Sequence, residues 1–438
     1  MNALKIYLQP ASLRMLALGF SAGLPLLLVL GTLSFWLREA GISRATIGHL
    51  SWVGLAYGFK WVWAPLVDRV SLPLLGRLGR RRSWLLLAQA GVMAGLLGMA
   101  LSDPQESLNV IVWCALLVAF SSATQDIALD AYRIESAGTE MQAALAASYQ
   151  GGYRLAMIWA GAGVLWIAAR AEVSSTATYA QAPWGMAYSV MALSMLVGVL
   201  TVLFSQEPEQ KQVMTRAKNL REWLQVALIN PFAEFCNRYG WQAFLILALI
   251  ATYRISDIVM GIMANPFYVD MGYTKDEVAA VTKIYGVAMT LLGAFVGGAL
   301  APKVGVMRLM MAGAVLSSLT NLLFVWLGSR GHDVSALIAV VSADNLASGI
   351  ASAAFIAYLS SLTNINYTAT QYALFSSLML LLPKFLAGFS GEFVDSQGYA
   401  NFFTGTALLG LPVLMLVWWA ARVQSASHAR PIPSLPSG

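Results

Sequence analysis

Long runs of apolar residues, separated by short polar segments, make up most of this chain. A run of about 20 mainly apolar residues predicts a membrane-spanning helix, because that length covers the hydrocarbon core of a bilayer. Prolines, glycines and charged residues bound twelve such runs, at residues 13–37, 47–67, 84–102, 109–132, 145–169, 184–204, 241–264, 280–300, 306–327, 335–361, 371–390 and 401–421. We therefore expect an all-α polytopic membrane protein with twelve transmembrane helices.

The longest polar stretch, residues 205–240, divides the predicted spans six and six. This division predicts two six-helix bundles, over residues 1–204 and 241–421, joined by a central loop. Residues 219–229 of that loop have helical periodicity, which is consistent with a helix lying along the membrane surface. Residues 422–438 are expected to form a disordered tail.

A weak sequence similarity between the two halves, which we call the internal echo, supports this division. The segment Trp36-Leu-Arg-Glu-Ala-Gly-Ile-Ser43 at the end of the first span resembles Tyr268-Val-Asp-Met-Gly-Tyr-Thr274 at the end of the seventh. A parallel duplication of six helices is a known arrangement of membrane transporters.

Lysine and arginine are distributed unevenly between the two sides of the membrane. With both termini in the cytoplasm, the cytoplasmic segments carry roughly three times as many of them as the opposite side, which is the usual bias. The bias predicts cytoplasmic termini and a cytoplasmic central loop. It also accounts for the net charge of +6 without a nucleic-acid partner.

Composition narrows the function classes. The chain is 58% hydrophobic and 11% charged, whereas a soluble domain is about 25% charged. Cys114 and Cys236 are far apart and the three histidines do not cluster, so we expect no disulfide framework, metal or cofactor. Gly19-Phe-Ser-Ala-Gly23 matches the nucleophile-elbow string of hydrolases, but it lies inside a span with no strand before it. We expect no enzyme.

Charged side chains at mid-membrane depth are the most informative feature. A charge at the centre of a bilayer costs about 2.5–3.5 kcal/mol, so it is tolerated where it faces protein or a watery pathway. The predicted spans contain five such cations and four such anions: Lys60, Arg154, Arg254, Lys283, Lys384, Asp126, Asp130, Asp257 and Asp344. These charges predict a polar pathway through the membrane.

The fourth predicted span has the densest polar cluster. Asp126 and Asp130 are four residues apart and share a helix face with Arg133. Repulsion between carboxylates favours retention of a proton by one of them, as proton-coupled transport requires. The alternative is a structural network in which Asp130 and Arg133 hold helices together. Arg154 either binds a substrate carboxylate or pairs permanently with Asp126.

In the second half, Arg254 and Asp257 are three residues apart and are expected to pair. Lys283 either snorkels to the membrane surface or takes part in an ion pair. Asp344 and Lys384 are isolated in sequence, so each needs a partner in space. Pairs that join the two halves would act as gates. Gly91–Gly95 and Gly293–Gly297 have the spacing of helix-contact motifs.

Several short strings carry a resemblance to a known family. They are Gly19-Phe-Ser-Ala-Gly-Leu-Pro25, the run from Lys60 to Arg69, Gln125-Asp126, Gly152-Tyr-Arg154, Arg254-Ile-Ser-Asp257, Asp344-Asn345 and Ala369-Thr-Gln371. Over most of residues 10–405 the chain resembles the AmpG-type permeases of the major facilitator superfamily. Two departures are a longer loop, Val70 to Leu78, before Arg80-Arg81-Arg82, and an end after twelve spans where some relatives add two.

The resemblance implies the major facilitator fold and a bacterial inner-membrane importer of anhydromuropeptides, GlcNAc-anhydroMurNAc and its peptides. Uptake in that family depends on the proton gradient and feeds the peptidoglycan recycling that controls β-lactamase induction. The charged and glutamine positions of the family map onto Lys60, Gln125, Asp126, Asp130, Arg154, Asp257 and Asp344.

Our hypothesis is a monomer in membrane lipid that works by alternating access. An anionic sugar–peptide is expected to bind Tyr57, Lys60, Gln125, Tyr153, Arg154 and Lys384. Proton coupling is assigned to Asp126, with Asp130 or Asp344. Gating or internal ion pairs are assigned to Asp68, Arg69, Arg133, Arg254, Asp257 and Lys283. Asp68, Arg69 and Arg80–Arg82 are expected to hold the cytoplasmic gate closed in one state. The alternatives are import of a siderophore, acyl-coenzyme A or another anionic solute, and a membrane-embedded enzyme or sensor.

Overall fold

Helices account for all the regular secondary structure of the described residues. The computed structural model describes residues 8–428 apart from 74, 137–138, 173–178, 209–221, 223–224, 226–228 and 363–367. The first half, up to residue 208, contains α1 (Pro10–Val29), α2 (Gly31–Glu39), α3 (Arg44–Leu50), η2 (Ser51–Gly54), α4 (Leu55–Phe59), η3 (Lys60–Val62), α5 (Ala64–Arg69), η4 (Leu75–Leu78), α6 (Arg80–Ala100), α7 (Pro104–Glu135), α8 (Thr139–Ile158), η5 (Trp159–Gly163), α9 (Val164–Ala171), α10 (Gln181–Ser194) and α11 (Leu196–Leu203). The second half, from residue 229, contains α13 (Asn230–Tyr239), α14 (Gln242–Thr252), α15 (Ile255–Asp270), α16 (Lys275–Val278), η7 (Ala279–Tyr285), α17 (Gly286–Val304), α18 (Val306–Arg330), α19 (Val334–Leu362), α20 (Thr368–Ala387), α21 (Ser390–Leu408) and α22 (Gly410–His428).

Ten helical segments of the described chain are long and apolar enough to cross a membrane. They are Pro10–Glu39, Arg80–Ala100, Pro104–Arg133, Ala147–Ala171, Gln181–Leu203, Gln242–Asp270, Lys275–Ala301, Val306–Arg330, Val334–Leu359 and Ser390–Val423. The predicted span 47–67 is instead a series of short helical pieces, α3 to α5, which ends in a helix with a proline in its first turn. The predicted span 371–390 coincides with α20, whose described apolar part, Leu374–Ala387, is shorter. The protein is thus embedded in a membrane, while the count of twelve spans stays a prediction.

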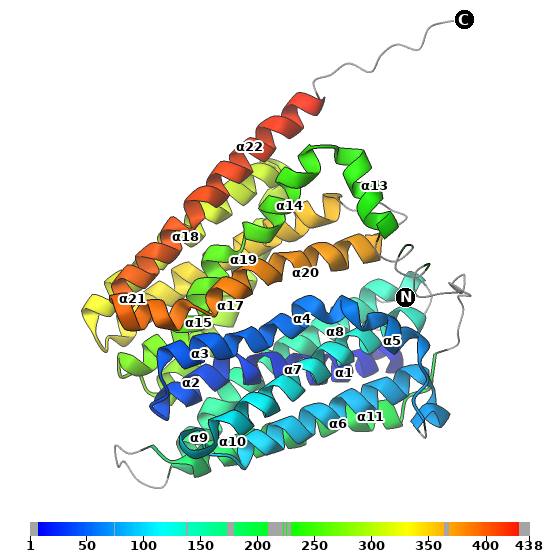
Figure 1. Ribbon diagram of the computed structural model, residues 1–438, viewed down its shortest axis with the longest axis vertical. Helices are drawn as coiled ribbons and strands as arrows, with labels where there is room; N and C mark the ends of the chain where they lie inside the picture. The colour runs from blue at the N-terminus through cyan, green and yellow to red at the C-terminus, as the bar shows by residue number, and fades with distance from the viewer. Residues whose placement is uncertain are drawn as a thin grey trace, which may run out of the picture.

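The helices of each half pack mainly on one another. In Figure 1 the blue-to-cyan helices of the first half lie together below the green-to-red helices of the second. Within the first half α1 packs on α8 and α6 on α7; within the second, α17 and α18 pack on α19. The boundaries of the two predicted bundles remain untested beyond this arrangement.

Glycines bring several helix pairs into close contact. A Cβ atom at Gly19 would lie 2.2 Å from the carbonyl oxygen of Tyr149, and one at Gly23 would lie 2.5 Å from that of Tyr153. The string Gly19-Phe-Ser-Ala-Gly23 is therefore a contact surface between α1 and α8. The same geometry holds for the two predicted motifs: Gly95 abuts α7, and Gly293 abuts α19, where a Cβ would meet a carbonyl oxygen at 2.9 and 2.2 Å respectively.

The sequence echo corresponds to the same backbone turn in both halves. Gly41 has a φ of +81° and Gly272 a φ of +80°, a conformation that glycine adopts without strain. Each turn is closed by equivalent hydrogen bonds, from Gly41 N to Arg38 O and from Gly272 N to Val269 O. Each is followed by a helix whose N-cap side chain, Ser43 or Thr274, accepts a backbone hydrogen bond. We call the end of the molecule that carries both turns the Arg44 end; it lies at the left of Figure 1.

Contacts between the halves extend from mid-depth to the Arg44 end. The principal ones join α2, α3, α4, η5 and α9 of the first half to α15, α16, η7, α20 and α21 of the second.

The predicted surface helix and the predicted tail fall partly beyond the described chain. The expected surface helix at 219–229 lies largely outside the described residues. The last helix ends at His428, within the stretch 422–438 that we expected to be a tail, so α22 is longer than predicted.

Candidate functional site

Lys60 and Asp126 form the central ion pair of the first half. Lys60 Nζ in η3 lies 3.6 Å from Asp126 Oδ2 in α7, and the two side chains are 30% and 19% exposed. Sequence analysis placed both at similar depth but did not pair them. Arg154 is exposed, and its Nη1 lies 3.7 Å from Met157 Sδ on the same helix. Lys60, rather than Arg154, is thus the partner of Asp126.

The neighbouring polar residues differ in their access to solvent. Gln125 is fully buried and its Nε2 donates to Ser21 Oγ at 2.8 Å, so it holds α7 against α1. This position favours a structural role over the expected contact with substrate. Tyr57 is also buried, whereas Tyr153 is partly exposed beside Tyr149, with ring centroids 6.1 Å apart.

Arginines near the far end of α7 bond within the first half. Arg133 Nη2 lies 3.6 Å from Asp130 Oδ1 on the same helix, and Asp130 is 55% exposed. This contact does not join two helices. Arg81 binds Glu135 through two hydrogen bonds, of 2.7 and 3.1 Å, which tie α6 to α7.

The expected cytoplasmic lock by Arg80–Arg82 in one transport state stays a prediction. Arg82 donates to the carbonyl oxygens of Val202 and Leu203 at the end of α11, again within the first half. The side chains of Asp68 and Arg69 lie outside the described residues.

The second half has its own charged cluster. Arg254, at the break between α14 and α15, lies 3.0 Å from Asp257 and also donates to Ser348 and Ser352 of α19. Asp344 of α19 accepts a hydrogen bond of 3.1 Å from Thr320. The mid-depth ion pairs described for Lys60 and Arg254 therefore form within halves, not between them.

Two other mid-depth cations, Lys283 and Lys384, are bound by neutral acceptors. Lys384 Nζ donates to the carbonyl oxygen of Gly54 at 3.0 Å, and it lies 5.4 Å from the centroid of the Tyr57 ring. Lys283 Nζ donates to Asn265 Oδ1 at 2.9 Å. Among the described residues, no carboxylate lies within ion-pair distance of either lysine. Lys283 thus neither snorkels nor forms the expected ion pair.

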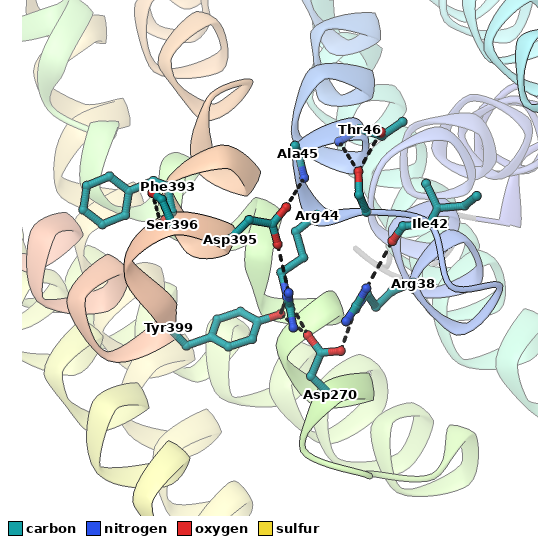
Figure 2. A network of polar contacts seen from close by, with 11 residues as sticks. Arg38, Ile42, Arg44, Ala45, Thr46, Asp270, Phe393, Asp395, Ser396 and Tyr399 are labelled. Atoms are coloured by element: carbon teal, nitrogen blue, oxygen red, sulfur yellow. Dashed lines mark hydrogen bonds and ion pairs between the residues drawn. The ribbon is translucent and has the colours of Figure 1, made fainter.

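Ion pairs between the halves gather instead at the Arg44 end. Figure 2 shows Asp270 of α15 between Arg38 and Arg44 of the first half, at 2.5 and 2.9 Å. Arg44 also pairs with Asp395 of α21 at 2.9 Å, and Tyr399 donates to Asp270. We call these five residues the Arg44 network.

The electrostatics of the Arg44 network keep its central cation charged. Burial opposes the charge on Arg44, but its hydrogen bonds with Asp395, Tyr399 and Asp270 outweigh that effect. Together they raise the pKa of the guanidinium above its ordinary value.

In a second cluster at the same end, the second half supplies the cation and the first half supplies the carboxylates. Lys275, which is 8% exposed, belongs to the second half and binds Glu39 at 2.5 Å as well as Glu172, both of the first half. Glu39 is oriented by a hydrogen bond of 2.8 Å from Trp184 Nε1. We call Lys275, Glu39 and Glu172 the Lys275 cluster. Cations thus come from both halves, and so do anions.

Sequence analysis missed both of these clusters. It used Arg38, Arg44 and Lys275 only to orient the chain. The available signal was the internal echo, because Glu39 and Asp270 stand at equivalent positions two residues before the turn glycines. Acidic residues beside cations at two related turns mark a place where the halves can pair.

A cavity near these residues is apolar. It has a volume of about 740 Å³, lies between η5 and η7, and its lining includes Trp159, Trp166 and Ile284 with Asp276 as its one charged member. Such a lining does not suit an anionic, sugar-containing ligand.

Comparison with known proteins gives one partial family match and several full-length relatives. The family model described as acetyl-coenzyme A transporter 1 matches residues 12–152. A Rickettsia conorii protein named as transporter AmpG 4 is 33% identical over 96% of this chain and 98% of its own length. The anhydromuropeptide permease of Escherichia coli K12 is 32% identical over 94% of this chain and 80% of its own length.

Solved structures share the fold at much lower identity. An inward-facing bacterial homologue of the human lysosomal transporter Spinster has a TM-score of 0.69 at 13% identity, over 99% of this chain and 100% of its own. A D-xylose–proton symporter also has a TM-score of 0.69 at 13% identity, over 93% and 96%. At these identities the likeness shows a shared transporter fold and nothing further.

Proposed function

The chain belongs to the AmpG family of anhydromuropeptide permeases, and we propose that it imports such sugar–peptides across the bacterial inner membrane. The observation that carries the proposal is the 32% identity to the Escherichia coli permease over nearly the whole chain. Transport, rather than catalysis, is consistent with the all-helical membrane fold and with charged clusters at mid-depth.

The transporter works by alternating access between two bundles of six helices. Lysine and arginine placement supports cytoplasmic termini, with the Arg44 end facing the periplasm. In that orientation the Arg44 network and the Lys275 cluster join the two halves at the periplasmic face, which supports a gating role for both. Cargo would enter after these pairs separate. The working unit is a monomer surrounded by lipid.

Anionic cargo binds near the mid-depth cations. Arg154 is exposed and Lys60 is 30% exposed, so the protein leaves part of each cationic side chain uncovered. Lys384, at the contact between α20 and the α4 region, extends this cationic surface to the second half. Asp344, with Thr320 as its partner, is a second candidate for holding a proton.

Proton coupling follows from the Lys60–Asp126 pair. While Asp126 is ionised, its carboxylate at 3.6 Å neutralises the Lys60 ammonium. Protonation of Asp126 removes that competition and leaves the ammonium available to a cargo carboxylate. Proton and cargo therefore bind together, and the proton gradient drives import.

The direct test is uptake of a labelled anhydromuropeptide into proteoliposomes with an imposed pH gradient. We expect wild-type uptake to collapse when an uncoupler is added. Asp126→Asn should bind cargo but lose gradient-driven accumulation, while Lys303→Met, at the exposed end of α17, serves as a charge-removal control. Absence of wild-type uptake would refute the cargo, and unchanged proton dependence in Asp126→Asn would refute the coupling.

A second candidate cargo is an acyl-coenzyme A, which is favoured by the family match over residues 12–152. That match covers one third of the chain, whereas the permease relatives cover nearly all of it. Competition separates the two: excess coenzyme A ester should leave uptake of the muropeptide unchanged.

A further inference from the structure

Two helix contacts between the halves are built in a similar way. In one contact α20 lies against α4 and η2, and in the other η7 lies against η5. In each, a lysine of the second half lies over a glycine of the first. A Cβ atom at Gly54 would lie 2.7 Å from Lys384 Nζ, and one at Gly161 would lie 3.3 Å from three carbons of the Lys283 side chain.

Both ammonium groups are held by neutral oxygen atoms. Lys384 donates to the carbonyl of Gly54, and Lys283 donates to the amide of Asn265. A cation within the membrane ordinarily requires an anionic or strongly polar partner. Since the described residues supply no carboxylate here, each lysine keeps unused capacity for a charge-assisted bond.

One of these bonds joins the two halves directly, and the other is linked to the closed arrangement through Asn265. The Lys384–Gly54 bond of 3.0 Å joins the second half to the first directly. Asn265, which holds Lys283, itself donates to the carbonyl oxygen of Gly31 in the first half at 2.9 Å. Separation of the halves would break the Lys384–Gly54 bond and the Asn265–Gly31 bond, whereas Lys283 and its acceptor Asn265 stay together in the second half. The Lys60–Asp126 pair lies within one half, so it has no such dependence.

We propose that Lys283 and Lys384 are exchangeable binding sites for carboxylates of the cargo, an inference that rests on the proposed function. When the halves are apart at the periplasmic face, Lys384 has lost its acceptor and Lys283 is held only by an amide that Gly31 no longer fixes, so both ammonium groups can bind carboxylates of an acidic peptide. When the halves close, Gly54 and Asn265 compete for the same donors, and the affinity for cargo falls. Closure thereby assists release on the other side.

The chemistry selects carboxylates over neutral groups. Lysine presents a compact positive charge with three donors and no acceptor. A carboxylate offers a stronger bond than the neutral carbonyl or amide that occupies the ammonium in the closed state. An amidated peptide would offer no such advantage. The two lysines therefore favour cargo with free carboxylates.

The test compares binding of two synthetic anhydromuropeptides, one with free peptide carboxylates and one with these groups amidated. Wild-type protein in proteoliposomes should prefer the free form. Lys283→Met and Lys384→Met should each reduce that preference about tenfold, the size expected for one hydrogen bond to a charged group. Lys303→Met, on the exposed end of α17, should leave the preference unchanged.

Gly54→Ala and Gly161→Ala test the exchange itself without removing a charge. A methyl group at either position crowds the lysine in its closed-state position. Both variants should keep the preference for free carboxylates but release cargo more slowly than wild type. They also keep the proposal testable if a methionine variant fails to fold.

The outcomes separate the two proposals. Wild-type binding with an unchanged preference in both methionine variants would overturn the lysine assignment alone. Failure of wild-type protein to bind either peptide would overturn the proposed function, and this inference with it. Faster or unchanged release in both alanine variants would refute exchange.

Discussion

Replacing Asp270 with asparagine removes the one carboxylate that binds both arginines of the Arg44 network. Arg38 and Arg44 contact its two oxygens at 2.5 and 2.9 Å, and Tyr399 donates to the second of them. Asparagine has nearly the same shape, so helix packing stays intact. The substitution therefore isolates the electrostatic contribution to closure at the Arg44 end.

The exposed fractions of the three side chains set the size of the expected effect on closure. The side chains of Arg38, Arg44 and Asp270 are 19%, 25% and 13% exposed, between a surface pair and a buried one. Exposed pairs contribute up to about 1 kcal/mol, and breaking a fully buried pair costs about 3–5 kcal/mol. We take about 1–1.5 kcal/mol for each pair, or about 2–3 kcal/mol for both. At 1.4 kcal/mol per factor of ten, the closed-to-open ratio falls by about 30- to 150-fold.

A distance measurement between spin labels at the Arg44 end reports this shift. Labels at Ala182→Cys and Ser329→Cys lie on exposed positions of different halves, in a background with Cys114 and Cys236 replaced by alanine. Wild-type protein should give mainly the short distance, and Asp270→Asn should populate a longer one.

The control is Asp103→Asn, which removes a carboxylate at the same end. Among the described residues its bonds, to Gln105 N and Tyr179, lie within the first half. It should leave the label distances unchanged. If Asp270→Asn gives the wild-type distribution, the Arg44 network does not determine closure. An equal shift in Asp103→Asn would mean that general loosening of this end, not the network, was measured.

Three further substitutions probe closure and helix packing. Gly391→Ala should prevent closure and abolish uptake, because its Cβ would lie 1.6 Å from a backbone oxygen of α3; Gly405→Ala on the same helix, with nothing nearer than 4.0 Å, should transport normally. Gly152→Ala should lower thermal stability in detergent, because its Cβ would lie 1.9 Å from a backbone oxygen of α1; Gly151→Ala, with its nearest atom at 3.7 Å, should melt like wild type. Glu39→Gln should shift the label distances less than Asp270→Asn, since a second carboxylate still binds the lysine of the Lys275 cluster; an equal or larger shift would contradict that account.

The run of apolar residues was enough to predict the helical membrane fold, but not how the span 47–67 is built. The first predicted span corresponds to Pro10–Glu39 because an unbroken apolar run leaves few alternatives in a membrane. The span 47–67 is also mainly apolar, yet it divides into short helical pieces where Gly54 and Gly58 meet α20. Hydropathy reports burial in lipid and contains no information about such close approaches.

The candidate site was predictable by residue type and not by partner. Arg254 and Asp257 could be paired in advance because a helix places residues three apart on one face. Asp126 has Lys60 as its partner from another helix, and only the packing of α7 against the α4 region determines that choice. The Arg44 network joins residues more than 200 positions apart, so no local pattern specifies it.

The mixed polarity of the two clusters at the Arg44 end determines what an arriving solute meets. Once the pairs separate, the first half presents two arginines beside two glutamates, and the second half presents one lysine beside two aspartates. A vestibule with so little net charge neither repels a polyanion nor draws it in from a distance. Entry rates should therefore change little with ionic strength, and selection by charge would take place deeper in the membrane.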